Sequence, residues 1–304
     1  MASSKKISFL PVDLATLLYL LVLSFLVLIF SKNNPHWLYF IILNFSFILV
    51  IFLIIRFLRD ETNLWQRFFR HWYPALFFTF LYEETGGLVH TIFGGWFDPF
   101  INSFELELFG VYPSVWFQKL SCLLLDEYMM LAYFSYYFLL ALLGAILYFK
   151  SKIKEFDKLI FSSAVAFYIS YLGFILFPVQ GPRYQLAGLY DCEIKGFLFT
   201  PLAQWVVNTG GLHGGCMPSS HCAVAFVVLV MAYRYHKILF AILAPIIISM
   251  FISTIYGRFH YFSDVAVGIL IGIFSIWLCD RIYPAGDKIE KSKIQMVAEE
   301  MPKK

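Results

Sequence analysis

The chain has 304 residues, of which 60% are hydrophobic, 20% aromatic and only 14% charged. So small a charged fraction excludes a soluble globular domain, which needs far more polar surface to face water. The net charge of +3 is too small to indicate binding to nucleic acid.

Eight apolar segments predict helices that cross the bilayer, because each approaches the roughly 20 residues that a transmembrane helix needs. In chain order they are 10–30, 36–57, 72–93, 127–149, 159–177, 220–235, 238–256 and 261–278. Segment 220–235 is short and segment 72–93 contains Glu83 and Glu84, so these two segments match the pattern of a transmembrane helix least well. The run at 10–30 is too long for the core of a signal peptide, and we expect it to be retained. We therefore predict an all-α fold, a polytopic transmembrane helical bundle of about eight spans.

Lysine and arginine are distributed unevenly between the two ends of these spans. With the N-terminus inside, the inner segments hold 18 of the 23 basic residues and the outer segments hold five. Cytoplasmic loops carry the excess of Lys and Arg, so both termini are expected in the cytoplasm. The loops at 178–219 and 257–260 are then extracytoplasmic.

Three parts are expected along the chain. Residues 1–125 supply N-terminal membrane helices and an outer aromatic segment, residues 126–283 form a membrane core with most of the polar motifs, and residues 284–304 form a mobile cytoplasmic tail. The aromatic stretch at 94–120 also contains Asp98, Glu105 and Glu107. Because Trp and Phe favour the headgroup zone, we expect this stretch to be interfacial or re-entrant on the outer face.

His260 and Asp264 stand four residues apart where the last span begins. Residues at this spacing share one face of a helix and can touch. A carboxylate bonded to one imidazole nitrogen leaves the other nitrogen free as a nucleophile, and Arg258 in the preceding loop could hold an oxyanion. A purely structural His–Asp pair at a helix start explains the spacing equally well.

Ser219, Ser220 and His221 form a second polar group where segment 220–235 begins. Pro218 suits the first turn of a helix, and the two serines then offer hydroxyls and backbone N–H groups to a phosphate at its positive end. His221 could protonate a leaving alkoxide as a general acid. Taken alone, a serine N-cap followed by a buried histidine is the simpler interpretation.

Arg183 follows the fifth span, and its planar guanidinium matches a phosphate bidentately. Polar residues at membrane depth are costly and usually functional. All three polar groups fall at the same predicted end of the bundle, so we predict that they form one phosphate site there.

Two of the five cysteines, Cys192 and Cys216, fall in the large outer loop. An oxidising extracytoplasmic compartment favours a disulfide between them, which would close the loop that carries the site. The spacing is also compatible with two free thiols.

These motifs resemble those of the type 2 phosphatidic acid phosphatase (PAP2) superfamily, over roughly residues 158–281. The run Pro218-Ser219-Ser220-His221 is similar to the family's Pro-Ser-Gly-His motif, and His260 with Asp264 matches its His-x-x-x-Asp motif. The resemblance implies a PAP2-like catalytic core in which His260 forms a phosphohistidine, Asp264 orients it and His221 protonates the departing oxygen. It implies neither a metal nor a cofactor.

The first motif departs from the family pattern. Leu176 stands where a Lys is usual, Pro182 precedes Arg183 instead of following it, and Thr254 stands where the family has an Arg. Gly-Pro-Arg and Arg-x-His-Tyr look more like the branch that contains inositol phosphotransferases.

We therefore expect an integral membrane lipid phosphatase, a metal-independent phosphoric ester hydrolase acting on a lipid phosphate monoester or pyrophosphate. The alternative is a lipid phosphotransferase similar to inositol phosphorylceramide synthase, which moves a phospho-headgroup to a lipid alcohol. The expected partners of the protein are a membrane lipid phosphate and the lipid bilayer. Nucleic acid is not expected as a partner.

Two further classes of protein fit the sequence less well. A transporter would use Glu83, Glu84 and Asp126 as its path, but would place its polar residues near the bilayer midplane. A metal enzyme would draw its ligands from His213, His221, His260 and Asp264. No two of these residues show the close spacing on one helical turn that is usual for metal ligands on a helix.

Overall fold

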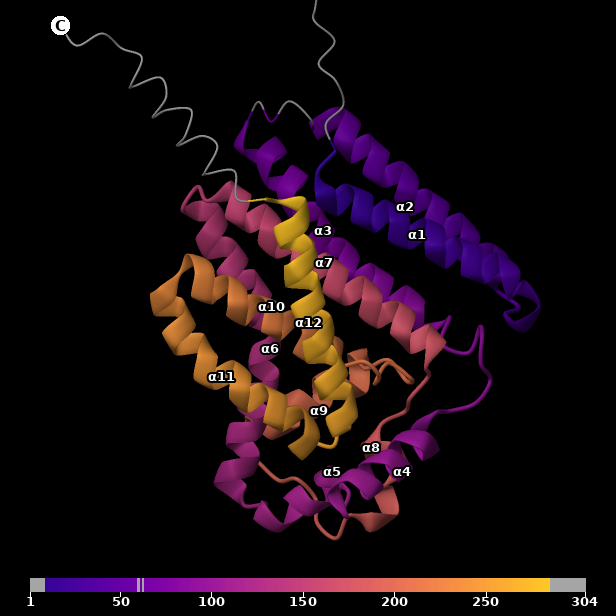
Figure 1. Cartoon of the computed structure of the whole chain (residues 1–304), viewed down its shortest axis with the longest axis vertical. Coiled ribbons are helices and arrows are strands. Elements are labelled where there is room, and N and C mark those ends of the chain that lie inside the picture. The colour runs from indigo at the N-terminus through magenta and orange to yellow at the C-terminus, as the bar shows by residue number, and fades with distance from the viewer. Residues whose placement is uncertain (1–8, 59–60, 62, 285–304) are drawn as a thin grey trace, which may run out of the picture.

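The computed structural model describes residues 9–58, 61 and 63–284. Every regular element in this part of the chain is helical, which confirms the predicted all-α fold (Figure 1). The tail predicted at 284–304 lies outside the described residues, except for Pro284. The helices are α1 (Pro11–Ile29), α2 (Trp37–Leu58), α3 (Leu64–Gly86), α4 (Asp98–Phe109), α5 (Pro113–Phe117), α6 (Leu123–Phe149), α7 (Ile153–Leu176), α8 (Pro182–Gln185), α9 (Phe199–Gly210), α10 (Ser220–Tyr235), α11 (Lys237–Tyr256) and α12 (Phe262–Ile282).

Six of these helices are long and apolar enough to cross a membrane, namely α1, α2, α6, α7, α11 and α12. All six coincide with predicted spans, and the chain is an integral membrane protein. The other two predicted spans are helices that do not meet the same criterion. Helix α3 begins at Leu64, before the predicted start at 72, and its first turns carry Arg67 and Arg70. Helix α10 has only 16 residues.

Helix α10 occupies the centre of the bundle, where α6, α7, α11 and α12 pack around it (Figure 1). Its apolar side chains are buried, among them Ala223, Val224, Val228 and Met231. A helix enclosed by other helices does not have to present a lipid-facing surface along a full membrane thickness. This enclosure explains how so short a helix is accommodated in the core.

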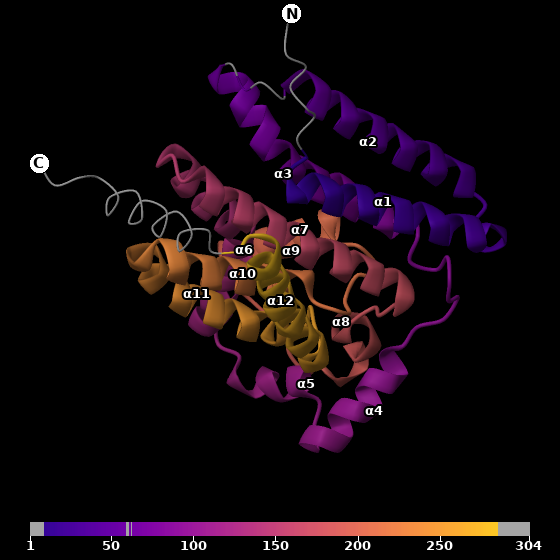
Figure 2. The ribbon, with the colours of Figure 1, turned by 45° about the horizontal axis from the view of Figure 1, so that its top comes forward.

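Helices α1 and α2 lie side by side along one flank of the bundle, next to α3 and α7 (Figure 2). Near the start of α1, the carboxylate of Asp13 accepts hydrogen bonds from Arg70 (Nη1 to Oδ1, 2.9 Å) and from the hydroxyl of Tyr73, both on α3. All three side chains are buried. Because buried charges must be paired, this contact fixes α1 against α3.

The two ends of the core differ in composition. At one end, called the motif end below, α10 and α12 begin and α4, α5 and α8 gather (Figure 1). At the opposite end, Nζ of Lys152 between α6 and α7 donates to the carbonyl of Tyr235 at the end of α10 (3.2 Å). Lys150 and Arg234 lie close by, so at least three basic residues gather at the end opposite the motif end.

Candidate active site

Chain segments next to α7, α10 and α12 meet at the motif end. The N–H of Cys216 donates to the carbonyl of Val179 (3.3 Å), and the N–H of Ser219 donates to the carbonyl of Asp264 (3.0 Å). Gly268 of α12 permits this approach, because a Cβ there would lie 2.4 Å from the carbonyl oxygen of Ser219. The three polar groups predicted to share one end of the bundle are therefore neighbours.

Asp98, at the start of α4, holds two of these segments together. Its carboxylate accepts hydrogen bonds from the N–H groups of Gln180 (2.9 Å) and Gly181 (2.8 Å) and from the hydroxyl of Tyr261 (3.1 Å). Gly181 has a φ of +99°, and a Cβ there would lie 2.9 Å from the sulfur of Cys216. Residue 181 thus has to be a glycine for the segment to pack this closely.

Glu105 extends the same contact along α4. Its carboxylate accepts hydrogen bonds from the backbone N–H (2.7 Å) and the hydroxyl (2.8 Å) of Ser263 in the first turn of α12, and burial raises its pKa. Asp98 and Glu105 were expected in an interfacial or re-entrant segment, without this structural role. Their spacing was the available signal, since Asp98, Ile101 and Glu105 form the buried face of one helix.

His260 lies in the loop between α11 and α12 and is only 4% exposed. Its Nδ1 is 3.3 Å from Oδ2 of Asp264, so the predicted contact is present. His260 nevertheless lies two residues before α12, and the two residues do not share a helical face as expected. Burial lowers the pKa of His260 to about 4, so the imidazole is neutral near pH 7. With Nδ1–H directed at the carboxylate, the free lone pair of the ring is on Nε2.

His221, in the first turn of α10, faces His260 with the two ring centres 5.6 Å apart. Its Nε2 is 3.5 Å from the hydroxyl of Tyr133, and its Nδ1 has no hydrogen-bonding partner among the described residues. The ring thus has a nitrogen available for a ligand beside His260.

The two serines before His221 have different surroundings. Ser219 is the N-cap of α10, because its hydroxyl accepts from the N–H of Cys222 (3.3 Å). Pro218 therefore precedes the cap and does not lie in the first turn as expected. Ser220 lines the cavity described next.

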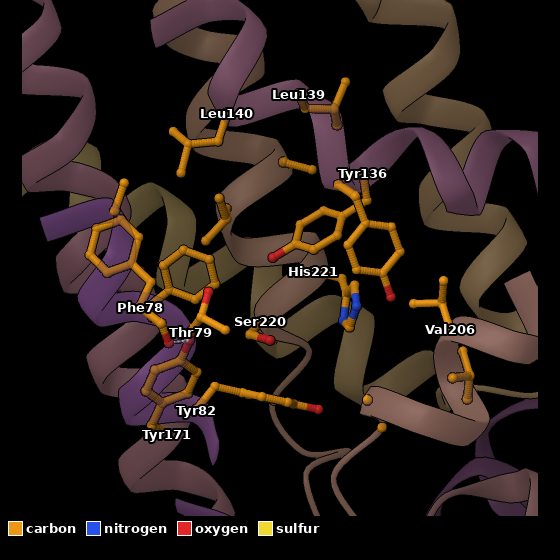
Figure 3. Close-up of a pocket in the computed structure, with 18 of the residues that line it drawn as sticks. Phe78, Thr79, Tyr82, Tyr136, Leu139, Leu140, Tyr171, Val206, Ser220 and His221 are labelled. Atoms are coloured by element: carbon orange, nitrogen blue, oxygen red, sulfur yellow. Dashed lines mark hydrogen bonds between the residues drawn. The ribbon is translucent and has the colours of Figure 1, made fainter. Parts of the chain in front are cut away.

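A cavity of about 400 Å³ opens beside His221 between α3, α6, α7 and α10 (Figure 3). His221 and Ser220 reach its wall from α10, and Glu83 reaches it from α3. The remaining wall is mainly apolar and includes seven aromatic side chains, those of Phe78, Tyr82, Tyr133, Tyr136, Tyr137, Phe167 and Tyr171. An apolar cavity with a few convergent polar groups is typical of a ligand site.

Arg183 and Arg258 line a second cavity of about 570 Å³, which has a more polar wall. Nη2 of Arg183 donates to Oδ1 of Asn208 (2.6 Å), and Nη2 of Arg258 donates to the carbonyl of Cys192 (2.6 Å). The two predicted phosphate-binding arginines are thus brought together, but not in the cavity that His221 lines. Phe259 of the polar cavity packs against Tyr133 of the aromatic cavity, with ring centres 4.4 Å apart.

A family model described as the PAP2 superfamily matches residues 111–278, which is more than half of the chain. The chain belongs to the PAP2 superfamily. The matched range includes every residue predicted for the site. No curated protein and no solved structure matches the chain. PAP2 membership and the apolar helices fit a lipid phosphatase or a lipid phosphotransferase.

The disulfide that the sequence suggested between Cys192 and Cys216 is absent, and both cysteines are free thiols in this PAP2 protein. The sulfur of Cys192 lies near Gln118, 3.9 Å from its carbonyl oxygen. The sulfur of Cys216 points instead toward the catalytic candidates, 2.9 Å from Oδ2 of Asp264 and 3.4 Å from Nδ1 of His260. Burial and the adjacent Asp264 raise the pKa of Cys216 well above its ordinary value.

His213 does not join the other histidines of this PAP2 site. It is exposed, its Nε2 lies 3.0 Å from Nε2 of Gln180, and its ring packs against Trp96. The four-residue metal set considered from the sequence is therefore not assembled.

Proposed function

We propose that this PAP2 protein is an integral membrane lipid phosphatase with His260 as its nucleophile. The observation that carries the proposal is the pairing of two histidines: Asp264 occupies the Nδ1 side of His260, and His221 faces His260 at 5.6 Å between ring centres. One imidazole then has a free nucleophilic nitrogen, and the other can reach the leaving group. The N-terminus of α10 beside them favours an anion.

The reaction has two steps. Nε2 of His260 attacks the phosphorus of a lipid phosphate monoester or pyrophosphate, the bond from phosphorus to the leaving oxygen breaks, and His221 donates a proton to that oxygen. Water then attacks the phosphohistidine, His221 takes up a proton from the water, and the phosphorus–nitrogen bond breaks to release phosphate. Asp264 holds His260 in the required tautomer. The proposed steps involve no metal or cofactor.

The phosphate-binding groups are proposed to be Ser220, Arg183 and Arg258. Ser220 shares the cavity of His221, and both arginines line the neighbouring polar cavity. The hydroxyl of Ser219 is engaged in capping α10, so we assign Ser219 to holding the helix start. The aromatic cavity is suited to the apolar part of a lipid, since most of the surface of its wall is apolar.

The catalytic core is proposed to span residues 126–283, with residues 1–125 as N-terminal membrane helices and outer segment. We also propose that both termini are cytoplasmic and that the motif end is extracytoplasmic. The support is the gathering of basic residues such as Lys150, Lys152 and Arg234 at the end opposite the motif end.

Phosphate release from a panel of phospholipid monoesters, by protein purified in detergent, tests the proposal. Wild type should release phosphate, and His260→Ala should release it roughly a thousandfold more slowly or not at all, as expected for loss of a nucleophile. His213→Ala is the matched control, because His213 is an exposed histidine of a neighbouring loop outside the histidine pair. An unchanged rate in His260→Ala would reject the mechanism.

The polar cavity favours one alternative, a lipid phosphotransferase that resembles inositol phosphorylceramide synthase. Besides the two arginines its wall contains Asp191, Glu193 and Gln204, which suit a polyol headgroup. Such an enzyme would form the same phosphohistidine and pass the phospho-headgroup to a lipid alcohol. It would release no phosphate from monoesters, but would transfer from a phosphodiester donor to an added alcohol.

A transporter fits less well. Of its three candidate path residues, Asp126 accepts hydrogen bonds from Ser121, from the N–H of Lys195 and from Tyr256, all near the motif end. Glu83 belongs to the aromatic cavity. Glu84 is buried next to Glu83 near the end of α3. The three candidate residues therefore do not mark a path through the membrane.

A further inference from the structure

Cys216 adds a thiol to the His260–Asp264 pair. Its sulfur lies 2.9 Å from Oδ2 of Asp264, 3.4 Å from Nδ1 of His260 and 3.1 Å from the carbonyl oxygen of Phe259. All three ionisable side chains are at least nine-tenths buried. In addition, Oδ1 of Asp264 is buried without a hydrogen-bonding partner among the described residues. A thiol, an imidazole and a carboxylate thus converge at one point, with a carbonyl beside them.

These separations are those of ligands around one small metal ion. Zn²⁺ binds sulfur, nitrogen and oxygen ligands at about 2.0–2.3 Å in tetrahedral geometry, which places neighbouring ligand atoms roughly 3.3–3.7 Å apart. The two separations from Nδ1 of His260, 3.4 Å to sulfur and 3.3 Å to oxygen, already lie near this range. The sulfur–oxygen separation of 2.9 Å would have to widen by roughly half an ångström for the three atoms to occupy three corners of the tetrahedron. A thiolate with an imidazole also selects a soft or borderline ion over Mg²⁺ or Ca²⁺.

We propose that Cys216, His260 and Asp264 form a binding site for a thiophilic divalent cation, Zn²⁺ or Cd²⁺, and that the bound ion inhibits the enzyme. The inhibitory part rests on the proposed function of His260. The site differs from the metal enzyme considered above, because it uses a thiol, excludes His213 and His221 and opposes the reaction.

The inhibition follows from where the protons go. The ion replaces the proton of the thiol, which leaves for solvent as the sulfur becomes a thiolate. The ion also occupies Nδ1 of His260, so the single proton of the neutral ring must move to Nε2. The nitrogen proposed to attack phosphorus then carries a proton and has no free lone pair. Asp264, drawn to the ion, no longer accepts a hydrogen bond from the ring.

Two readouts on the purified full-length protein test this inference. The first is the ultraviolet thiolate-to-Cd²⁺ charge-transfer band, which reports binding whether or not the protein is a phosphatase. The second is phosphate release during titration with Zn²⁺ or Cd²⁺, followed by addition of EDTA. In wild type the band should saturate over the same metal range in which activity is lost, and EDTA should reverse both.

The variant for comparison is Cys216→Ser, with Cys122→Ser as the matched control because Cys122 is an exposed free thiol of the same motif end. Each variant is referred to its own metal-free activity. Cys122→Ser should retain wild-type sensitivity, whereas Cys216→Ser should need at least about tenfold more metal and lose the band, as expected when a metal site loses a ligand.

Equal metal sensitivity in Cys216→Ser and wild type would overturn the inference. The inference would also be overturned if the charge-transfer band of the wild type saturated without inhibition of phosphate release. That comparison requires no variant. Absence of any phosphatase activity, together with a band that depends on Cys216, would reject the proposed function and keep the metal site. Absence of the band in a wild type that releases phosphate would reject the metal site and leave the proposed function standing.

Discussion

His221 is the residue whose role is most directly open to a leaving-group test. If it protonates the departing oxygen, its loss should matter when that oxygen is a poor leaving group and should matter little when the leaving group needs no proton. We expect His221→Gln to slow the release of phosphate from an alkyl lipid phosphate about 10²–10⁴-fold. Release from an aryl phosphate such as p-nitrophenyl phosphate should fall much less. The measurement is kcat/KM for both substrates, and an equal loss on both would contradict the role as an acid.

The burial of His260 has a consequence for stability at acidic pH. Its pKa in the folded protein is about 4, below the ordinary value of about 6.5 that applies to the unfolded chain. Between these two values the unfolded chain binds a proton that the folded protein does not, so stability falls as pH falls. Thermal unfolding in detergent should show wild type losing stability more steeply than His260→Gln from about pH 6.5 to about pH 4. His213→Gln should follow wild type, and parallel curves for wild type and His260→Gln would refute the expected shift.

At the level of helices, the buried pair of Asp13 and Arg70 is expected to determine how α1 attaches to α3. Asp13→Ala removes the buried hydrogen bonds that its carboxylate accepts from Arg70 and Tyr73, and a hydrogen bond to a charged group typically contributes about 1.5–3 kcal/mol. We expect Asp13→Ala to lower the thermal midpoint in detergent clearly. Arg234 and Asp280 form a matched ion pair between α10 and α12 that is half-exposed, and Asp280→Ala should cost about 1 kcal/mol or less. Similar shifts in both variants would show that burial does not control the contribution of the pair.

Helices also show where sequence and structure agree. Of the eight spans predicted from apolar runs, six are helices long and apolar enough to cross a membrane, because a lipid-facing helix must be apolar along its length. The start of α3 was missed because its first turns contain Arg67 and Arg70 and face neighbouring helices as well as lipid. Helix α4 was not predicted as a helix, since its polar residues Asp98 and Glu105 are inward and its phenylalanines are outward.

In the candidate site, too, some features were predicted from the sequence and others were not. His260 and Asp264 were found because they stand only four residues apart, and His221 was found because it ends the contiguous run Pro218-Ser219-Ser220-His221. The aromatic cavity was not found, because its tyrosines come from three helices and no local spacing connects them. The expected disulfide was wrong because the presence of two cysteines in one loop does not determine where their side chains point. Cys216 faces the histidine–aspartate pair, and Cys192 faces Gln118.

At the scale of the whole molecule, the proposed orientation makes opposite predictions for two loops. Glu193 lies in the loop of the polar cavity at the motif end, and Lys154 lies at the start of α7 at the opposite end; both are exposed. In intact cells, a membrane-impermeant maleimide should label Glu193→Cys and should label Lys154→Cys only after permeabilisation. Both variants also carry Cys122→Ser and Cys192→Ser, since these two thiols would otherwise react with the maleimide. Labelling of Lys154→Cys before permeabilisation would reverse the proposed orientation.

The shortness of α10 would set the depth in the bilayer at which the proposed chemistry takes place. Its 16 residues span about 24 Å, whereas the hydrocarbon layer of a bilayer is about 30 Å thick. The end of α10 lies at the basic turn with Lys152, which in the proposed orientation would anchor at the cytoplasmic headgroup level. His221 at the start of the helix would then lie several ångströms below the opposite headgroup layer, beside the aromatic cavity. A lipid could therefore keep its chains in the bilayer and sink its phosphate to the histidines, while water would have to enter from the polar cavity.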